Sequence, residues 1–402
     1  MAAPLAGLKI VELARVLAGP WAGQVLADLG ADVIKIESLA GDDTRQWGPP
    51  FVENGDGTRD AAYFHACNRG KRSIAVDFTT SGGRDIVRRL ASRADVLIEN
   101  FRVRGLRKYR LDYQALQAIN PRLIYCSVTG FGQTGPYADL PGYDFLIQAM
   151  GGIMDLTGDP GGEPQKVGVA FADIFSGLYA VIAIQAALAA RAQTGHGQWI
   201  DMALFDVQVG VLANQAMNYL VSGVAPTRLG NAHPNIVPYQ VFAAADSSLV
   251  IAVGNDGQFR NLVGVLAVPD IADDPSFASN EARVANRAKL IAGLSALIAK
   301  FKRADLLKRL ERARVPAGPI NNVAEVFADP QLIDRGMRLN LPRPGSDGVP
   351  TVRTPILMSD SNLVYGRASP RLGEHTSEVL AELGYEMEEV TGLMTNGAVG
   401  GY

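Results

Sequence analysis

The sequence predicts an α/β protein built on a largely parallel, doubly wound sheet, accompanied by a smaller α+β domain. Two observations support this prediction. In the first third of the chain, short apolar runs typical of strands alternate with segments of helical periodicity. The chain also has 402 residues, of which 48% are hydrophobic, and this exceeds the length at which a single core usually stops growing. We therefore expect two domains.

The first strand–helix–strand unit is expected at the N-terminus. Residues 8–13 form an apolar run, residues 20–29 follow with helical periodicity up to Gly30, and residues 31–37 form a second apolar run. Helical crossovers between apolar strands favour parallel pairing. The pattern recurs downstream, where we expect strands at 73–77, 94–99 and 123–128 and a helix at 82–93.

The character of the sequence changes near Gly223, where a segment rich in Pro and Asn begins. A strand is expected at 249–253 and a helix at 286–300. The predicted boundaries are 1–224 for the first part of the large domain, 225–320 for the small domain and 321–402 for a return to the large domain. A further helix is expected at 376–383, and the Gly-rich tail from Asn396 is expected to fray.

Composition argues against several classes of partner. Lys and Arg number 38 against 41 Asp and Glu, so the formal charge of -3 favours neither a nucleic acid nor a membrane surface. Cys67 and Cys126 are too few for a disulfide framework and lack zinc-ligand spacing. The four scattered histidines likewise indicate no metal site.

A cytoplasmic location is expected. Lys9 and Glu12 interrupt what would be the apolar core of a secretory signal. The most apolar stretch, residues 178–190, is shorter than the roughly 20 residues needed to span a bilayer. The two cysteines are expected to be reduced and buried.

One carboxylate stands where a long apolar helix is expected to begin. Asp173 is the only acidic residue in the segment 167–197. Backbone N–H groups and the helix dipole near a first turn would keep the carboxylate ionised, as a nucleophile requires. The alternative is ordinary N-capping of the helix.

The loop 14–23 follows the first predicted strand, where open α/β sheets place their ligand crevice. Glu37 at the end of the second strand resembles the acid that binds ribose in dinucleotide enzymes, so an NAD-dependent oxidoreductase is one alternative. However, the loop lacks the G-x-G-x-x-G pattern. A plain strand-to-helix connection remains the other interpretation.

Basic residues gather in two segments, 68–73 and 99–110, and these would supply positive charge for a phosphate-bearing ligand. Asn100 and Phe101 would add amide and stacking contacts. The alternative for the arginines of the second segment is a solvated helix face. A Gly-dense run at 129–144 either lets the backbone approach a ligand closely or forms a series of turns.

Taken together, these segments resemble the family III CoA-transferases over nearly the whole chain. The resemblance is carried by ELARVLAGPWAGQVLADLGADVIKIE, NRGKRSIAVDF, DVLIENF, SVTGFGQTGPY, GYDF and GVAFADIFSGLYA. It implies a Rossmann-like large domain, a smaller second domain and an interlocked homodimer. Asp173 falls on the catalytic aspartate of the family, and no permanently bound cofactor or metal is implied, because coenzyme A is itself part of the substrate.

The resemblance and the basic segments together predict the residues that contact CoA. They are Val16, Leu17, Ala18, Lys71, Arg72, Asn100, Phe101, Arg104, Lys108 and Tyr143. Two features depart from the family pattern. Ser38 replaces an arginine near the CoA nucleotide, and RVRG (residues 102–105) follows the Asn-Phe pair in place of a Pro-Gly turn.

Three further segments resemble the succinyl-CoA:glutarate branch of the family: residues 41–52, 230–242 and 315–331. This narrower resemblance implies succinyl-CoA as the donor and a glutarate-like dicarboxylate or its sulfinate analogue as the acceptor. A distal carboxylate would need a cationic or hydrogen-bonding partner, for which Arg15, Arg45 and His233 are the candidates.

The implied mechanism is covalent and proceeds through an aspartyl mixed anhydride and an aspartyl-CoA thioester. One alternative is an α-methylacyl-CoA racemase, which resembles the same superfamily. The resemblance implies that such a racemase relies on the histidine of a Gly-His-Asp motif. Here the motif reads Gly142, Tyr143, Asp144. A CoA-binding protein without catalysis is a further alternative.

Overall fold

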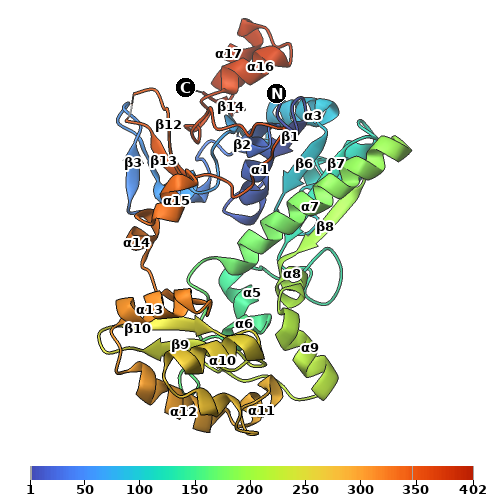
Figure 1. The fold of residues 1–402 in the computed structure, drawn as a ribbon. Coiled ribbons are helices and arrows are strands. Elements are labelled where there is room, and N and C mark those ends of the chain that lie inside the picture. The colour runs from blue at the N-terminus through green and yellow to red at the C-terminus, as the bar shows by residue number, and fades with distance from the viewer. Residues whose placement is uncertain (1, 346, 402) are drawn as a thin grey trace. The chain divides into compact units, whose positions relative to one another are not determined.

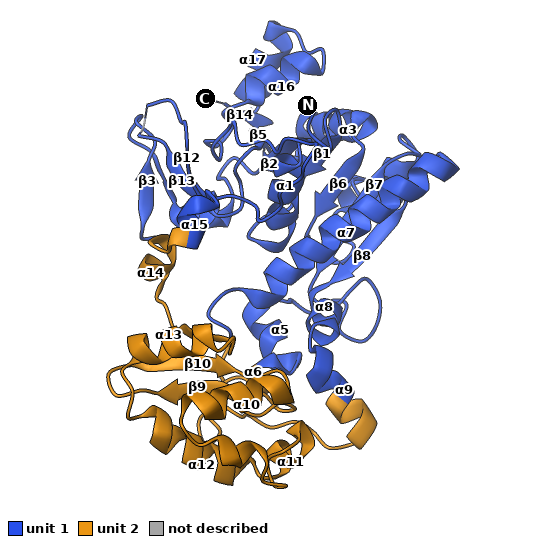
Figure 2. Ribbon diagram, in the orientation of Figure 1, with its two compact units in different colours: residues 1–153, 167–217, 331–402 blue, residues 154–166, 218–330 orange. Residues whose placement is uncertain are grey.

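The structure is a computed structural model that describes residues 2–345 and 347–401. The chain forms two compact units (Figure 2). The large unit contains residues up to Ile153, Val167–Met217 and residues from Gln331 onward, and the small unit contains Met154–Lys166 and Asn218–Pro330.

The small unit is therefore more extensive than the predicted range 225–320. The segment Met154–Lys166 also belongs to it. Asp155 of this segment pairs with Arg228, with 2.9 Å between Oδ1 and Nη1. This pairing joins segments far apart in the chain, and no local pattern in the sequence indicates it.

A seven-stranded sheet forms the centre of the described part of the large unit, in the order β14-β5-β2-β1-β6-β7-β8 (Figure 1). Every pair of neighbours is parallel except β14 with β5. The parallel strands are β1 Lys9–Glu12, β2 Asp32–Glu37, β5 Arg72–Val76, β6 Val96–Glu99, β7 Ile124–Thr129 and β8 Trp199–Ala203. The predicted α/β class and parallel sheet are confirmed.

Helices pack on both faces of this sheet because its strands bury apolar side chains on both sides. Ile10, Ile98 and Ile124 point into one core, which α1 (Ala18–Asp28) and α7 (Phe171–Thr194) cover. Val11, Leu97 and Tyr125 point into the other. That second core is covered by α3 Ser81–Arg93, α4 Tyr113–Gln117, α16 Thr376–Glu382 and α17 Met387–Thr395.

Helix α7 is the longest in the described chain, with 24 residues, and it packs against α1 and β7. It is longer than the stretch 178–190 suggested, and within the described residues it alone meets the length and composition of a membrane span. The core helix of a soluble protein meets the same criterion.

The C-terminal tail does not fray as predicted. β14 (Val399–Gly400) pairs antiparallel with β5 at the sheet edge. The remaining elements of the large unit are short: β3 Phe51–Glu53, β4 Arg59–Ala61, α2 Ala62–His65, α5 Asp144–Met150, α8 Leu204–Gly210, β12 Arg338–Leu341 and β13 Val349–Val352. Two one-turn 3₁₀ helices, Asp43–Gln46 and Arg107–Tyr109, also belong here.

The small unit contains a three-stranded antiparallel sheet in the order β11-β10-β9, with its own apolar core. Its elements are β9 Tyr239–Ala243, β10 Ser248–Ala252, α10 Asp256–Val265, the 3₁₀ helix Pro269–Ala272, α11 Asn280–Ala285, α12 Arg287–Ile298, α13 Arg303–Arg312, β11 Ala317–Pro319 and α14 Val323–Phe327. Helices α6 Ile153–Leu156, α9 Ala213–Ser222 and α15 Pro330–Asp334 cross the boundaries between the units.

Candidate functional site

A cleft of about 580 Å³ opens in the large unit at the carboxyl ends of the parallel strands. This is the edge at which open α/β sheets bind ligands. Nine of the predicted site residues line it: Arg15, Val16, Leu17, Ala18, Asn100, Phe101, Lys108, Tyr143 and Asp173. The structure thus brings together residues that are separated by most of the first half of the chain.

Asp173 lies in the first turn of α7, as the sequence predicted. Close contact between α7 and α1 brings this turn to the loop after β1. Gly177 makes that contact possible, because a Cβ atom there would lie only 2.7 Å from the carbonyl oxygen of Ala18. The carboxylate and the loop Val16–Ala18 therefore share one cleft.

Asp144, at the start of α5, caps the beginning of α7. Its Oδ1 accepts hydrogen bonds from the N–H groups of Ala172, at 2.8 Å, and of Asp173, at 3.2 Å. Its Oδ2 accepts from Nε2 of Gln148, a fully buried side chain, at 2.7 Å. The backbone donors expected to stabilise an ionised Asp173 are thus occupied by a second carboxylate.

This arrangement corrects the expectation that Asp173 is held firmly in its ionised form. Burial, and then the nearby negative charge of Asp144, raises the pKa of Asp173 to about 7. Near neutral pH the carboxylate is therefore divided between its acid and its anion. A pKa displaced this far in a cleft is a feature of functional carboxylates.

We expect activity that depends on the Asp173 anion to rise with pH through about 7 in the free enzyme. In Asp144→Asn the amide oxygen can still accept the two N–H groups, but the negative charge is gone. The acidic limb of the kcat/KM profile should therefore move to lower pH, although not to the value of a free aspartate, because burial remains.

Glu99→Gln is the control for this pH profile. Burial also raises the pKa of Glu99 to about 7, and Glu99 lies outside the cleft. If the acidic limb moves in Glu99→Gln and stays in place in Asp144→Asn, the titrating group is Glu99 and the assignment to Asp173 is wrong.

The Gly-dense run contributes to the cleft mainly through chain packing. Gly130 and Gly142 lie against each other, since a Cβ atom on Gly130 would be 2.4 Å from the Cα of Gly142. Both line the cleft beside Tyr143. The sequence suggested that these glycines let the backbone approach a ligand closely. In the structure, Gly130 and Gly142 let two backbone segments approach each other.

A second cavity of about 570 Å³ adjoins the cleft and shares Arg15, Asp43, Trp47, Phe78 and Phe101 with it. Phe78 packs edge-on against Phe101 and Tyr109, with ring centroids 5.6 Å and 5.2 Å apart. The two cavities together offer room for a long ligand, with aromatic rings along one wall.

Comparison with known proteins identifies the family. The sequence model of CoA-transferase family III matches residues 5–376. The chain belongs to CoA-transferase family III. It is 59% identical to the succinate–glutarate CoA-transferase of Agrobacterium fabrum over 382 residues, which are 94% of this chain and 96% of that protein. It is 40% identical to the human succinyl-CoA:glutarate CoA-transferase, over 98% of this chain and 90% of that protein.

A solved structure of the family has the same fold. The crystal structure of a CaiB/BaiF family protein from Brucella suis matches with a TM-score of 0.85 and 63% sequence identity, covering 95% of this chain and 100% of that chain. The protein is therefore a family III CoA-transferase with the α/β fold of that structure.

Two predicted CoA contacts of this CoA-transferase require correction. Lys71 is fully buried, and its Nζ is occupied by Glu12 Oε1 at 2.9 Å and the carbonyl oxygen of Pro20 at 2.8 Å. Arg72 begins β5 at the opposite edge of the sheet, where it pairs with Asp32 and Glu378. Neither side chain lines the cleft.

The prediction for Arg45 is also wrong. Its guanidinium is buried and binds Glu37 at 2.7 Å and Asp60 at 2.9 Å. The same pairing occupies the carboxylate of Glu37, which removes the ribose-binding acid that an NAD-dependent oxidoreductase would need. His233 lies in the small unit, where its Nδ1 accepts the N–H of Asn235 at 3.0 Å, and its role stays a prediction.

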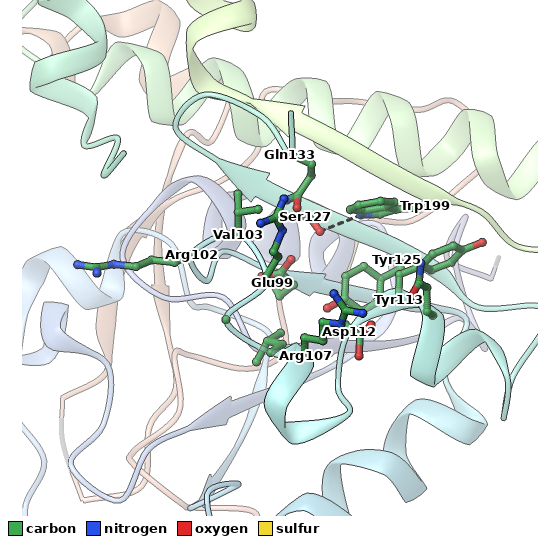
Figure 3. Close-up of a pocket in the computed structure, with 14 residues that line it drawn as sticks. Glu99, Arg102, Val103, Arg107, Asp112, Tyr113, Tyr125, Ser127, Gln133 and Trp199 are labelled. Carbon is green, nitrogen blue, oxygen red and sulfur yellow. Dashed lines mark hydrogen bonds between the residues drawn. The ribbon is translucent and has the colours of Figure 1, made fainter. Parts of the chain in front are cut away.

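Arg104 lines a smaller cavity of about 200 Å³. Figure 3 shows this cavity with Glu99, Ser127 and Trp199 among its lining residues. Buried Glu99 is one wall of this cavity, and its Oε2 accepts the N–H of Phe101 at 2.8 Å. Figure 3 also shows Trp199 donating to Ser127, at 2.9 Å. Arg104 is therefore not brought to the cleft, whereas Arg102 lines both cavities.

Sequence reasoning missed several residues that line the cleft. They are Asp43, Trp47, Phe78, Thr79, Tyr109, Val128, Asp139, Leu140, Asp144 and Leu204. The position of Phe78 just after a strand end was a usable signal, but Trp47 comes from a loop whose place no periodicity indicates. In residues 2–345 and 347–401, no group of His, Cys, Asp or Glu is arranged to hold a metal ion.

Proposed function

We propose that this CoA-transferase moves CoA from succinyl-CoA to a glutarate-like dicarboxylate, or to its sulfinate analogue, with Asp173 as the covalent nucleophile. The observation that carries the proposal is the position of Asp173 in the cleft with Val16–Ala18 and Tyr143. Relatives that act on succinyl-CoA and glutarate align over nearly the whole chain, and this supports the choice of substrates.

The proposed reaction conserves the thioester through four transfers. The Asp173 carboxylate attacks the donor thioester and expels CoA thiolate, which leaves a mixed anhydride. The thiolate then attacks the aspartyl carbonyl, which releases the donor carboxylate and forms an aspartyl-CoA thioester. The acceptor carboxylate attacks this thioester, expels CoA thiolate and forms a second mixed anhydride with Asp173. The thiolate then attacks the acceptor acyl carbon, which forms the product thioester and releases the Asp173 carboxylate. No proton is gained or lost overall.

CoA is proposed to lie across the two adjoining cavities. Its thioester end would reach Asp173, and its nucleotide end would lie near Phe78 and Phe101, where a base can stack. Arg15, Arg102 and Lys108 are the cations of the cleft wall, and of these Arg102 and Lys108 would meet the phosphates. Ser38, which replaces an arginine of the family pattern, lines the adjoining cavity as a neutral group.

Arg15 is the remaining candidate in this cleft for the distal carboxylate of the substrate. Its guanidinium is exposed and pairs with Asp43 at 2.7 Å. Exchanging one exposed carboxylate partner for another costs little, because surface ion pairs are weak. Arg15 can therefore turn from Asp43 to a substrate carboxylate.

We also propose that the enzyme is the interlocked homodimer of its family and acts in the cytoplasm. One face of α7 leaves Tyr179 and Ile182 exposed, at 43% and 61%, and α9 leaves Leu220 71% exposed. Exposed apolar side chains such as these on α7 and α9 favour contact with another protein chain. Cys67 and Cys126 are free thiols, which fits a reducing compartment.

CoA transfer from succinyl-CoA to a panel of dicarboxylates and sulfinates tests the proposal. We expect glutarate and its close analogues to be the best acceptors and oxalate to be poor. The same preparation should sediment with the mass of two chains. Succinyl-CoA that is bound but never consumed with any acceptor would support a CoA-binding protein without catalysis. Deuterium incorporation at the α carbon without acyl exchange would support the racemase.

A further inference from the structure

A buried group of four charges lies directly beneath the loop that follows β1. Lys35 Nζ is 3.2 Å from Glu12 Oε1 and 2.9 Å from Asp42 Oδ2, and Lys71 Nζ is 2.9 Å from the same Glu12 oxygen. All four residues are at most 3% exposed. Two anions and two cations balance, as buried charges must.

Hydrogen bonds from the side chains around this group hold the backbone of the loop. Lys35 donates to the carbonyl oxygen of Ala14 at 2.8 Å. The N–H of Val16 donates to Asp42, at 3.2 Å to Oδ2. From the cleft side, Asn100 accepts from the N–H of Arg15 at 3.0 Å and donates to its carbonyl oxygen at 2.6 Å.

The loop needs this support because its backbone is strained. Val16 has φ of 71°, in the left-handed region where a β-branched residue is rarely found. Such strain persists only when surrounding contacts impose it, and it is concentrated at functional sites. Val16 lies between Arg15 and Leu17, and all three line the cleft just before α1 begins at Ala18.

We propose that Asp42 and Asn100 are positioning residues that impose the left-handed conformation of Val16 and so shape the loop for acyl-CoA. This inference rests on the proposed function, in which that loop contacts CoA. It reassigns Asn100 from a direct ligand contact to a support, because both polar atoms of its amide are occupied by Arg15. Neither residue touches the reacting atoms.

Electrostatics make Asp42 a constant anion. Burial alone would raise the pKa of Asp42, but Lys35 and the Thr44 N–H lower it to about 2. The same carboxylate helps to raise the pKa of Lys35 against the effect of burial. The acceptor for the Val16 N–H is therefore charged throughout the pH range of activity, and bonds to charged acceptors are the stronger kind.

The test compares Asp42→Asn with wild type in steady-state transfer and in direct CoA binding by calorimetry. The amide has nearly the shape of the carboxylate, but its NH₂ group faces Lys35. We expect the KM for the acyl-CoA donor to rise about tenfold, with the KM for the acceptor unchanged, because a misplaced loop weakens alignment of the donor. Asn100→Ala should have the same effect from the cleft side, where folding depends on it less.

Val16→Gly provides the readout that a merely structural role would not change. Glycine adopts positive φ without strain, so in this background the loop needs less support. Asp42→Asn should then raise the donor KM by only about twofold to threefold. Equal effects in both backgrounds, or an unchanged donor KM in folded Asp42→Asn, would overturn the proposal.

Failure of the proposed function has a different signature. In that case wild type itself would transfer no CoA from succinyl-CoA to any dicarboxylate or sulfinate, whether or not it binds CoA. If Asp42→Asn does not fold, the effect of Asn100→Ala in the wild-type chain and in the Val16→Gly variant decides the proposal by the same criterion.

Discussion

Asp173→Asn should lower CoA transfer by about 10³-fold or more while leaving CoA binding intact. Removing a covalent nucleophile blocks the reaction at its first step, and losses of this size are typical of such residues. The amide has the size of the carboxylate, so the cap that Asp144 provides to the backbone of Ala172 and Asp173 can remain. The measurement is the initial rate of transfer from succinyl-CoA, together with calorimetric binding of CoA.

Trapping with hydroxylamine locates the intermediate. Wild type mixed with succinyl-CoA should yield a hydroxamate on the peptide that carries Asp173, and the variant should yield none. Tyr143→Phe is a matched control from the same cleft that leaves the carboxylate in place. If Asp173→Asn transfers CoA at the wild-type rate, Asp173 has only a structural role at the start of α7 and the proposed mechanism is refuted.

Gly23→Ala should lower the free energy of unfolding by about 3 kcal/mol or more, although it changes neither charge nor a cleft residue. A Cβ atom at Gly23 would lie 1.8 Å from Glu12 Oε2 and 3.3 Å from Lys71 Cε. The fully buried carboxylate cannot move aside without weakening its bonds to the two buried lysines. The expected result is a large fall in the denaturant midpoint.

Gly392→Ala is the control for this substitution. Gly392 also lies inside a helix of the large unit, α17, but a Cβ atom there would meet nothing within 4 Å. Removing backbone freedom from the unfolded chain should leave Gly392→Ala equally stable or more stable by up to about 1 kcal/mol. Equal stability of the two variants would mean that the charge group beneath the loop adapts readily.

The order of strands and helices was predictable from local patterns. Residues 8–37 contain an apolar run, a helical segment ended by Gly30 and a second apolar run, and they fold as β1, α1 and β2. The edge of the sheet at which a ligand binds follows from parallel pairing. Asp173 was recognisable as well, because a single carboxylate at the start of a long apolar helix is conspicuous in any sequence.

Partners of the charged residues were not predictable in the same way. Lys71 and Arg45 read as cations available to a phosphate or a carboxylate, yet both are buried against acidic residues. Asp144 lies 28 residues before Ala172 and yet caps the helix of the nucleophile. Charges become neutralised through contacts between distant segments, and local periodicity carries no information about those contacts.

The sequence by itself therefore determined the fold class, the family resemblance and the carboxylate that we propose as the nucleophile. Only the tertiary structure decided which cations line the cleft, why the pKa of Asp173 is raised to about 7, and what holds Val16 in its strained conformation. The physical reason is that secondary structure follows from patterns within a few residues. Burial, ion pairing and backbone strain instead depend on neighbours that the fold alone brings together.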